Sequence, residues 1–123
     1  MDIKSFSEPQ KQAFMDLLVL GMYVDHNLAS AEDAGVQRLL DSFQFKSDYE
    51  RQQFSDAVFT RASRHAQSPD EARAYALELA SNFSTPEIRR GVYDALNDFL
   101  TIDGHVTTEE SKLLAVVKQA FRL

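Results

Sequence analysis

The chain contains no cysteine among its 123 residues, and this absence excludes several kinds of site. Disulfide bonds, thiolate zinc sites, iron–sulfur clusters and a cysteine nucleophile all require that side chain. Any metal ion that the chain holds must therefore bind oxygen, or oxygen together with imidazole.

Glycine and proline are also scarce, with four and three residues, and runs of β-branched residues are few. Apolar residues recur at spacings of three and four, which is the period of an amphipathic helix. No stretch alternates convincingly between apolar and polar residues, so we expect no strand. The pattern predicts an all-α fold.

Long hydrophobic runs are missing as well. The most apolar stretch, residues 13–24, is about half as long as a membrane span, which needs roughly twenty apolar residues, and it contains Asp16. The first residues do not form a basic export signal. We therefore expect no membrane insertion and a cytoplasmic location.

Basic charge is in short supply, because 13 Lys and Arg residues face 19 Asp and Glu residues and the net charge is −6. Nucleic acids and anionic membrane surfaces bind through positively charged patches. The balance predicts a protein without a nucleic-acid partner.

Hydroxyl residues followed by carboxylates mark six helix starts, because a hydroxyl accepts from exposed backbone N–H groups and a carboxylate favours the positive helix end. The starts are Ser7, Ser30, Ser47, Ser68, Ser84 and Thr107. The predicted helices span 7–24, 31–43, 48–65, 69–82, 86–101 and 108–122. Short connections favour one bundle over residues 1–123. The first and fifth helices are the most apolar, so we expect both at its centre.

An internal repeat is the most informative feature of the sequence. Residues 16–43 align with residues 94–121 without a gap, and hydrophobic character is kept around the central turn. Five aligned pairs are identical: Asp16 and Asp94, Leu18 and Leu96, Asp25 and Asp103, Glu32 and Glu110, and Phe43 and Phe121. The repeat predicts two pseudo-symmetric helix–turn–helix halves.

The negative charge is concentrated in the two repeated segments. Residues 16–33 contain four acidic residues and residues 94–110 contain five, and neither segment contains Lys or Arg. The two segments together carry −9. The rest of the chain, with 10 acidic and 13 basic residues, carries +3.

The two acidic turns, residues 25–32 and 103–110, each begin with Asp and have Glu seven positions later. Hard divalent cations take oxygen ligands clustered on a tight turn, although an EF-hand loop spans twelve residues and these turns span about eight. If the two halves pack about a pseudo-twofold axis, both turns can share one ion. We therefore predict Asp25, Glu32, Asp103 and Glu110 as ligands for calcium, magnesium or manganese.

Other interpretations of the acidic turns stay open. Asp-Gly is ordinary turn chemistry, and carboxylates are favoured in the first turn of a helix whether or not an ion binds. The acids can also form a docking patch for a basic partner. Zinc is less favoured, because His26 and His105 are offset by one position in the alignment.

Several other charged residues have simple structural explanations. Asp16 and Asp94 interrupt apolar helices, and we expect them at exposed edges or in pairs. Arg61 and Arg64 are expected on a solvated face or as partners for the acids. His65 lies near the end of the third predicted helix, where an imidazolium complements the helix dipole.

The turn Asp103-Gly104-His105-Val106-Thr107-Thr108-Glu109-Glu110, preceded by the apolar stretch 95–102, resembles the tellurite-resistance TerB-like domain family. Residues 25–32 form a degenerate copy, in which His26 stands where the family usually has glycine. The resemblance implies an all-helical fold with two pseudo-symmetric halves and a role in tellurite and general stress responses. It also implies a cation site, which falls on Asp25, Glu32, Asp103 and Glu110.

No common catalytic or phosphate-binding motif occurs, and no nucleophile can be paired with a base. The leading hypothesis is therefore a non-enzymatic, stress-response binding module whose acidic turns hold a divalent cation or a basic partner. The alternative is an adaptor that docks a protein, or a second copy of the chain, through an apolar helix face. A metal-dependent hydrolase is the least favoured, because no general base can be named.

Overall fold

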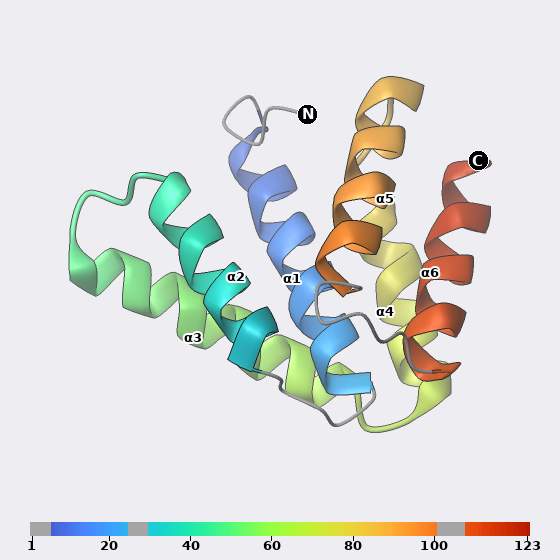
Figure 1. Cartoon of the computed structure of the whole chain (residues 1–123), viewed down its shortest axis with the longest axis horizontal. Helices are drawn as coiled ribbons and strands as arrows, with labels where there is room; N and C mark the ends of the chain where they lie inside the picture. Colours follow the sequence, from blue (N-terminus) through green and yellow to red (C-terminus); the bar gives the residue numbers. More distant parts are fainter. Residues whose placement is uncertain (1–5, 25–29, 101–107) are drawn as a thin grey trace.

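The computed structural model describes residues 6–24, 30–100 and 108–123, without the side chains of residues 30–33. The described residues form six helices and no strand, so the all-α prediction is confirmed (Figure 1). Every boundary lies within two residues of its predicted position. The helices are α1 (Glu8–Val24), α2 (Ser30–Ser42), α3 (Asp48–His65), α4 (Pro69–Ala80), α5 (Pro86–Leu100) and α6 (Thr108–Phe121).

Hydroxyl caps fix three of the starts as the sequence predicts. The Ser47 hydroxyl accepts from the Glu50 backbone N–H at 3.1 Å, and the Ser68 hydroxyl accepts from that of Glu71 at 3.1 Å. At α1 the bonding is reciprocal: the Gln10 N–H donates to the Ser7 hydroxyl, and the Ser7 N–H donates to the Gln10 side chain. Each bond satisfies a donor that has no partner inside its helix.

The fifth helix begins at Pro86 as predicted, but its capping hydroxyl is one residue later than expected. The Ile88 N–H donates to the hydroxyl of Thr85 at 3.2 Å, so Thr85 is the cap, not Ser84. Pro86 then takes the first helical position, where a missing N–H costs nothing and the fixed φ angle suits a helix.

Helix α1 lies at the centre of the fold, as its sequence predicts. Every residue from Ala13 to Met22 is buried. Figure 1 shows α1 between α2 and α5, and α1 also contacts α3, α4 and α6. A helix that is apolar on all sides is stable only when neighbours cover all of them.

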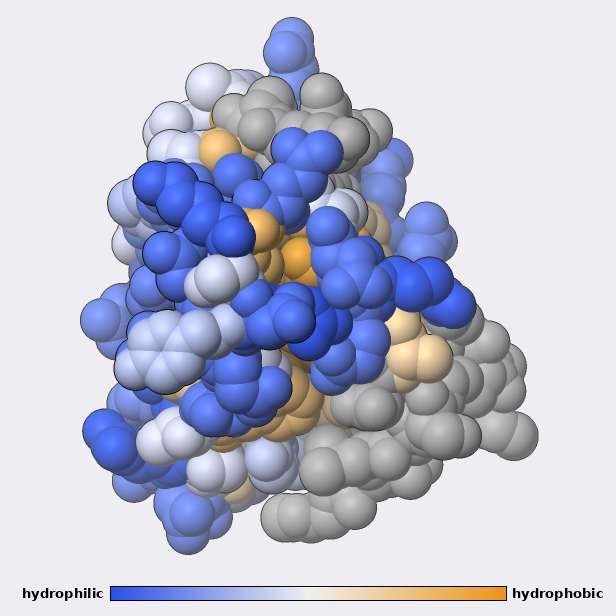
Figure 2. Space-filling model, turned by 90° about the vertical axis from the view of Figure 1, so that its left-hand side faces the viewer, coloured by the Kyte–Doolittle hydropathy of each residue, from blue (hydrophilic) through white to orange (hydrophobic). Residues whose placement is uncertain are grey.

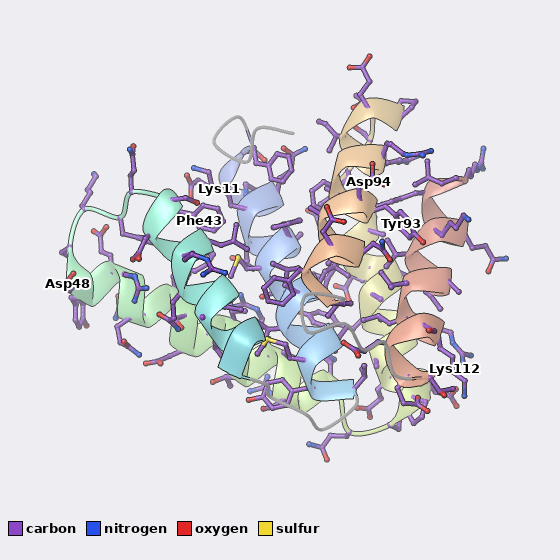
Figure 3. The ribbon with its side chains drawn as sticks, in the orientation of Figure 1. Lys11, Phe43, Asp48, Tyr93, Asp94 and Lys112 are labelled. Carbon is purple, nitrogen blue, oxygen red and sulfur yellow. The ribbon has the colours of Figure 1, made fainter. Side chains whose placement is uncertain are left out.

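Helix α5 does not share the centre, so this part of the prediction is wrong. Only Val92, Leu96, Phe99 and Leu100 of this helix are buried, and its outer face exposes charged and polar side chains. Asp94 lies on that outer face, with 58% of its side chain exposed (Figure 3). Helix α5 is thus an amphipathic cover over α1 and α6.

Two glycines bring the end of α5 close to its neighbours. A Cβ atom at Gly21 of α1 would lie 2.8 Å from Leu100 Cδ2, and one at Gly35 of α2 would lie 2.8 Å from Phe99 Cε2. Such distances are too short for carbon atoms, so a side chain at either position would displace Leu100 or Phe99, and glycine permits the close packing of α5.

Aromatic rings pack the connection between α2 and α3 against α3. Phe43, Phe45 and Phe54 form a cluster with ring centroids 5.2–6.2 Å apart. The Lys11 ammonium of α1 lies 5.8 Å from the Phe43 ring (Figure 3). Figure 2 looks onto the side where α3 and α2 lie, and hydrophilic atoms cover most of it, with apolar atoms showing in a recess.

Candidate functional site

Three of the four predicted cation ligands have side chains that the structure does not describe. Asp25 and Asp103 fall in undescribed segments, and Glu32 lies in α2 without a described side chain. Glu110, in the first turn of α6, is buried with 1% of its surface exposed. In the part of the chain that the structure describes, no three His, Asp or Glu residues cluster as metal ligands do. The cation site therefore stays a prediction, and so does the zinc alternative, because His26 and His105 are also undescribed.

A cavity lies where the end of α1 faces the start of α6, and it is here called the helix-end hollow. Its volume is about 520 Å³. Val24, the last residue of α1, lines it together with Thr108 and Glu109, the first residues of α6. The residue that precedes the first acidic turn and the last residues of the second thus border the same cavity, while contact between the two turns stays a prediction.

Basic side chains at the helix-end hollow are paired within their own helices. Lys112 lies 3.8 Å from Glu109, and Arg73 lies 3.8 Å from Asp70. Lys112 lies at the start of α6 (Figure 3). All four side chains are largely exposed, so solvent screens both pairs and they contribute little to stability.

A second cavity, the α2–α5 groove, lies over α1 between helices α2 and α5 and has a volume of about 370 Å³. Figure 1 shows α2 leaning away from α5, with α1 visible between them. Its lining is mainly apolar, and comprises Phe14, Leu18, Gly35, Arg38, Leu39, Ser42, Ala95, Asp98 and Phe99. An apolar cavity with a few polar groups at its edge is the usual form of a binding site.

The Asp16 network is a buried polar cluster that joins α1, α3 and α4. Asp16 of α1 is 1% exposed. The Arg61 guanidinium donates two hydrogen bonds to its carboxylate, each of 3.0 Å. The Tyr75 hydroxyl donates a third, of 2.8 Å, and the His65 ring stacks on the Tyr75 ring with centroids 3.9 Å apart. A bidentate arginine and a tyrosine hydroxyl together compensate the burial of the carboxylate.

The Asp16 network changes the acidity of its members. Burial raises the pKa of Tyr75 to about 12, and the hydrogen bond to Asp16 acts in the same direction. The hydrogen bonds that Arg61 itself donates to Asp16 raise the pKa of the guanidinium, against the opposing effect of partial burial. Because Tyr75 is harder to ionise in the folded state, its contribution to stability is complete below about pH 10 and is lost as the pH rises towards 12.

The predictions for these charged residues meet different outcomes. Arg61 forms an ion pair with Asp16. Pairing is one of the two arrangements expected for each of these residues. His65 does lie in the last turn of α3, but its stacking on Tyr75 has no signal in the sequence. The burial of Asp16 could have been predicted from the sequence, because the apolar residues around it leave its helix without a polar face.

The aligned aspartates of the internal repeat occupy opposite environments. Asp16 is buried in its network, whereas Asp94 is exposed. The Asp94 carboxylate lies 3.5 Å from the guanidinium of Arg90, one turn earlier in the same helix. An exposed pair of this kind contributes about 0.3–0.5 kcal/mol. The two aligned aspartates therefore have different structural roles. Pseudo-symmetry of the two halves stays a prediction.

Comparison with known proteins does not assign a function to either cavity. Within the described residues, no helix is both long enough and apolar enough to cross a membrane. No protein-family model, curated protein or solved structure matches the chain. The resemblance to the TerB-like family consequently depends on the motif residues alone and stays a prediction.

Proposed function

We propose that the chain is a non-enzymatic adaptor that binds a protein partner in the α2–α5 groove. The observation that carries this proposal is the groove itself: an open, mainly apolar cavity walled by three helices. Apolar surface gains free energy when a partner removes it from water, by about 25 cal/mol per Å².

The chemistry of the lining favours binding over catalysis. The described residues that line the groove offer one hydroxyl, on Ser42, and it donates to the Leu39 carbonyl of its own helix at 2.6 Å. A nucleophile needs a base within hydrogen-bond reach, and this lining supplies no histidine for that role. The polar groups at the edge, Arg38 and Asp98, suit recognition by charge.

Site-specific photocrosslinking in the native host tests the proposal. A photoreactive amino acid at Leu39 or at Ala95 lies in the groove, and we expect it to capture a discrete protein. The same amino acid at Leu77 is the control, because Leu77 is 48% exposed on α4 and does not line the groove. The captured protein, once purified, should bind the wild-type chain and lose at least tenfold in affinity towards Leu39→Glu.

Capture at all three positions alike, or none at Leu39 and Ala95, would contradict an adaptor role for the groove. A captured second copy of the chain would instead assign the groove to self-association. Circular dichroism of each labelled protein establishes that it is folded.

A second candidate function is divalent-cation binding by Asp25, Glu32, Asp103 and Glu110. The helix-end hollow supports it, because Val24, which precedes the first turn, lines the same cavity as Thr108 and Glu109. Calcium, magnesium and manganese all suit carboxylate ligands. Both candidates are compatible in one protein, since the hollow and the groove have no lining residue in common.

Thermal unfolding with and without ions tests the cation site. An ion at 100 times its dissociation constant stabilises the folded state by about 2.7 kcal/mol, which is on the order of 10 °C for a chain of this size. We expect such a shift between EDTA and one of the ions, and its loss in Asp25→Asn/Asp103→Asn. The control is Asp48→Asn/Asp56→Asn on α3, which removes the same charge and should keep the shift. An unchanged wild-type midpoint would exclude a tight site, and a shift that survives Asp25→Asn/Asp103→Asn would place the ion elsewhere.

The biological setting of either function follows from the TerB-like resemblance alone. A role in tellurite or general stress responses is part of the proposal on that basis. The cytoplasmic location is proposed from the sequence.

A further inference from the structure

The walls of the α2–α5 groove have the spacing of a helix-packing surface. Helix α2 contributes Gly35, Leu39 and Ser42, at intervals of four and three residues. Helix α1 contributes Phe14 and Leu18, four residues apart, and α5 repeats this interval with Ala95 and Phe99. Rows of side chains at these intervals form the ridges between which another helix packs.

The end of the groove is shaped by close contact between its two walls. The Phe99 ring of α5 sits against Gly35 of α2, where a Cβ atom would lie 2.8 Å from it. Away from this contact helices α2 and α5 diverge (Figure 1). The groove lies between them, with Phe14 and Leu18 of α1 in its lining.

The groove lining also favours a helical over an extended backbone in the bound partner. An extended peptide in the groove would press backbone N–H and C=O groups against the side chains of Leu39 and Ala95, which offer no hydrogen bonds. A helix satisfies these groups internally, so only its side chains need to match the groove. Helix-in-groove binding through residues at i, i+3, i+4 and i+7 is an established mode of recognition.

Arg38 supplies the charge that orients the occupant. Its side chain is exposed on α2 and lines the groove. No ion pair involving Arg38 occurs among the described residues, whereas Arg51 and Arg61 each bind an aspartate. The rim on this side of the groove is therefore positive, and a carboxylate on the partner complements it.

We propose that the occupant of the α2–α5 groove is an amphipathic α-helix of a partner protein, with a carboxylate beside Arg38. This inference rests on the adaptor function proposed above and adds the form and charge of the partner. The apolar face of the partner helix lies on Leu39 and Ala95, the partly exposed apolar residues of the lining, and its carboxylate lies beside Arg38.

A displayed library of 16-residue peptides tests the inference. Each peptide has apolar residues at helical spacing and randomised residues along both edges of that face. Selection is run against the wild type, Arg38→Glu and the control Arg64→Glu, which makes the same charge change on α3. We expect Asp or Glu to be enriched on one edge with the wild type and with Arg64→Glu, and Lys or Arg with Arg38→Glu. Matched charges should improve affinity about two- to fivefold, as exposed pairs do.

The outcomes separate this inference from the adaptor function. Peptides that bind the wild type and fail on Leu39→Glu, or on Ala95→Glu if the former is unfolded, occupy the groove. If such peptides are non-helical by circular dichroism, or if Arg38→Glu leaves the selected charge unchanged, the inference is wrong and the adaptor function stands. If no selected peptide responds to either groove substitution and photocrosslinking captures nothing, the adaptor function is wrong as well.

Discussion

Replacing Arg61 by methionine is expected to lower the free energy of unfolding by about 3–5 kcal/mol, because it leaves a buried charge without its cation. Asp16 is 1% exposed, so water cannot replace the guanidinium fully. Tyr75 alone would then hold the carboxylate, through one hydrogen bond of 2.8 Å. Urea unfolding followed by circular dichroism measures the loss.

A matched control is the surface pair of Arg51 and Asp41. Its N–O distance is 3.1 Å, almost the same as the 3.0 Å between Arg61 and Asp16, but 71% of the Asp41 side chain is exposed. We expect Arg51→Met to cost about 0–1 kcal/mol, because solvent screens that pair. The comparison shows what burial and the second hydrogen bond of the Arg61 pair contribute together, since Arg51 binds Asp41 through one bond and donates its other bonds to Gln37.

The double variant Asp16→Leu/Arg61→Met completes the test. Removing both charges leaves no buried ion, so we expect it to recover most of the stability that Arg61→Met loses. Alkaline titration of tyrosinate absorbance then reports on Tyr75, which in the wild type should ionise near pH 12, later than an ordinary tyrosine. A loss below 1 kcal/mol in Arg61→Met, or a double variant less stable than both single ones, would contradict this account of the Asp16 network.

The local parts of this fold were predictable because their causes are local. Ser47 and Ser68 cap their helices through bonds to residues three positions away, and the hydroxyl and carboxylate pattern shows this directly. Thr85 was missed because Ser84 and Thr85 are both good caps, and only Pro86 at the first helical position decides between them.

Long-range features could not be predicted in the same way. Leu100 and Phe99 are placed by Gly21 and Gly35, which lie at least 64 residues earlier in the chain. A glycine within a helical pattern signals a close approach but does not name the partner. The α2–α5 groove depends on these contacts, so the sequence analysis reached only an unspecified apolar helix face.

The internal repeat illustrates another limit. Alignment of the repeat gives Asp16 and Asp94 equal weight, although one is buried and the other is exposed. Environment depends on which helices cover a position, and α1 is covered on all sides while α5 is not. Identity within a repeat is therefore evidence for common ancestry or common turn chemistry more than for a shared function.

Replacing Phe83 by alanine is expected to cost about 3–5 kcal/mol, although Phe83 lies in the connection between α4 and α5 rather than in a helix. Its ring is 0% exposed, with its centroid 5.8 Å from that of Phe6 and 6.1 Å from that of Phe121. It thus joins the first described residue of the chain to the last turn of α6. The Arg89 guanidinium donates to the Phe83 carbonyl at 2.7 Å, which fixes the backbone at that point.

Because Phe6, Phe83 and Phe121 form one cluster, their contributions should not be additive. Once Phe83→Ala has opened a cavity, Phe121→Ala removes fewer contacts, so the double variant should cost less than the sum of the single ones by about 0.5–3 kcal/mol. Leu77→Ala is the control, because Leu77 is 48% exposed and its loss should stay within about 0.5 kcal/mol. Additive losses, or a cost for Phe83→Ala no larger than that of Leu77→Ala, would mean that the two ends of the chain are held independently.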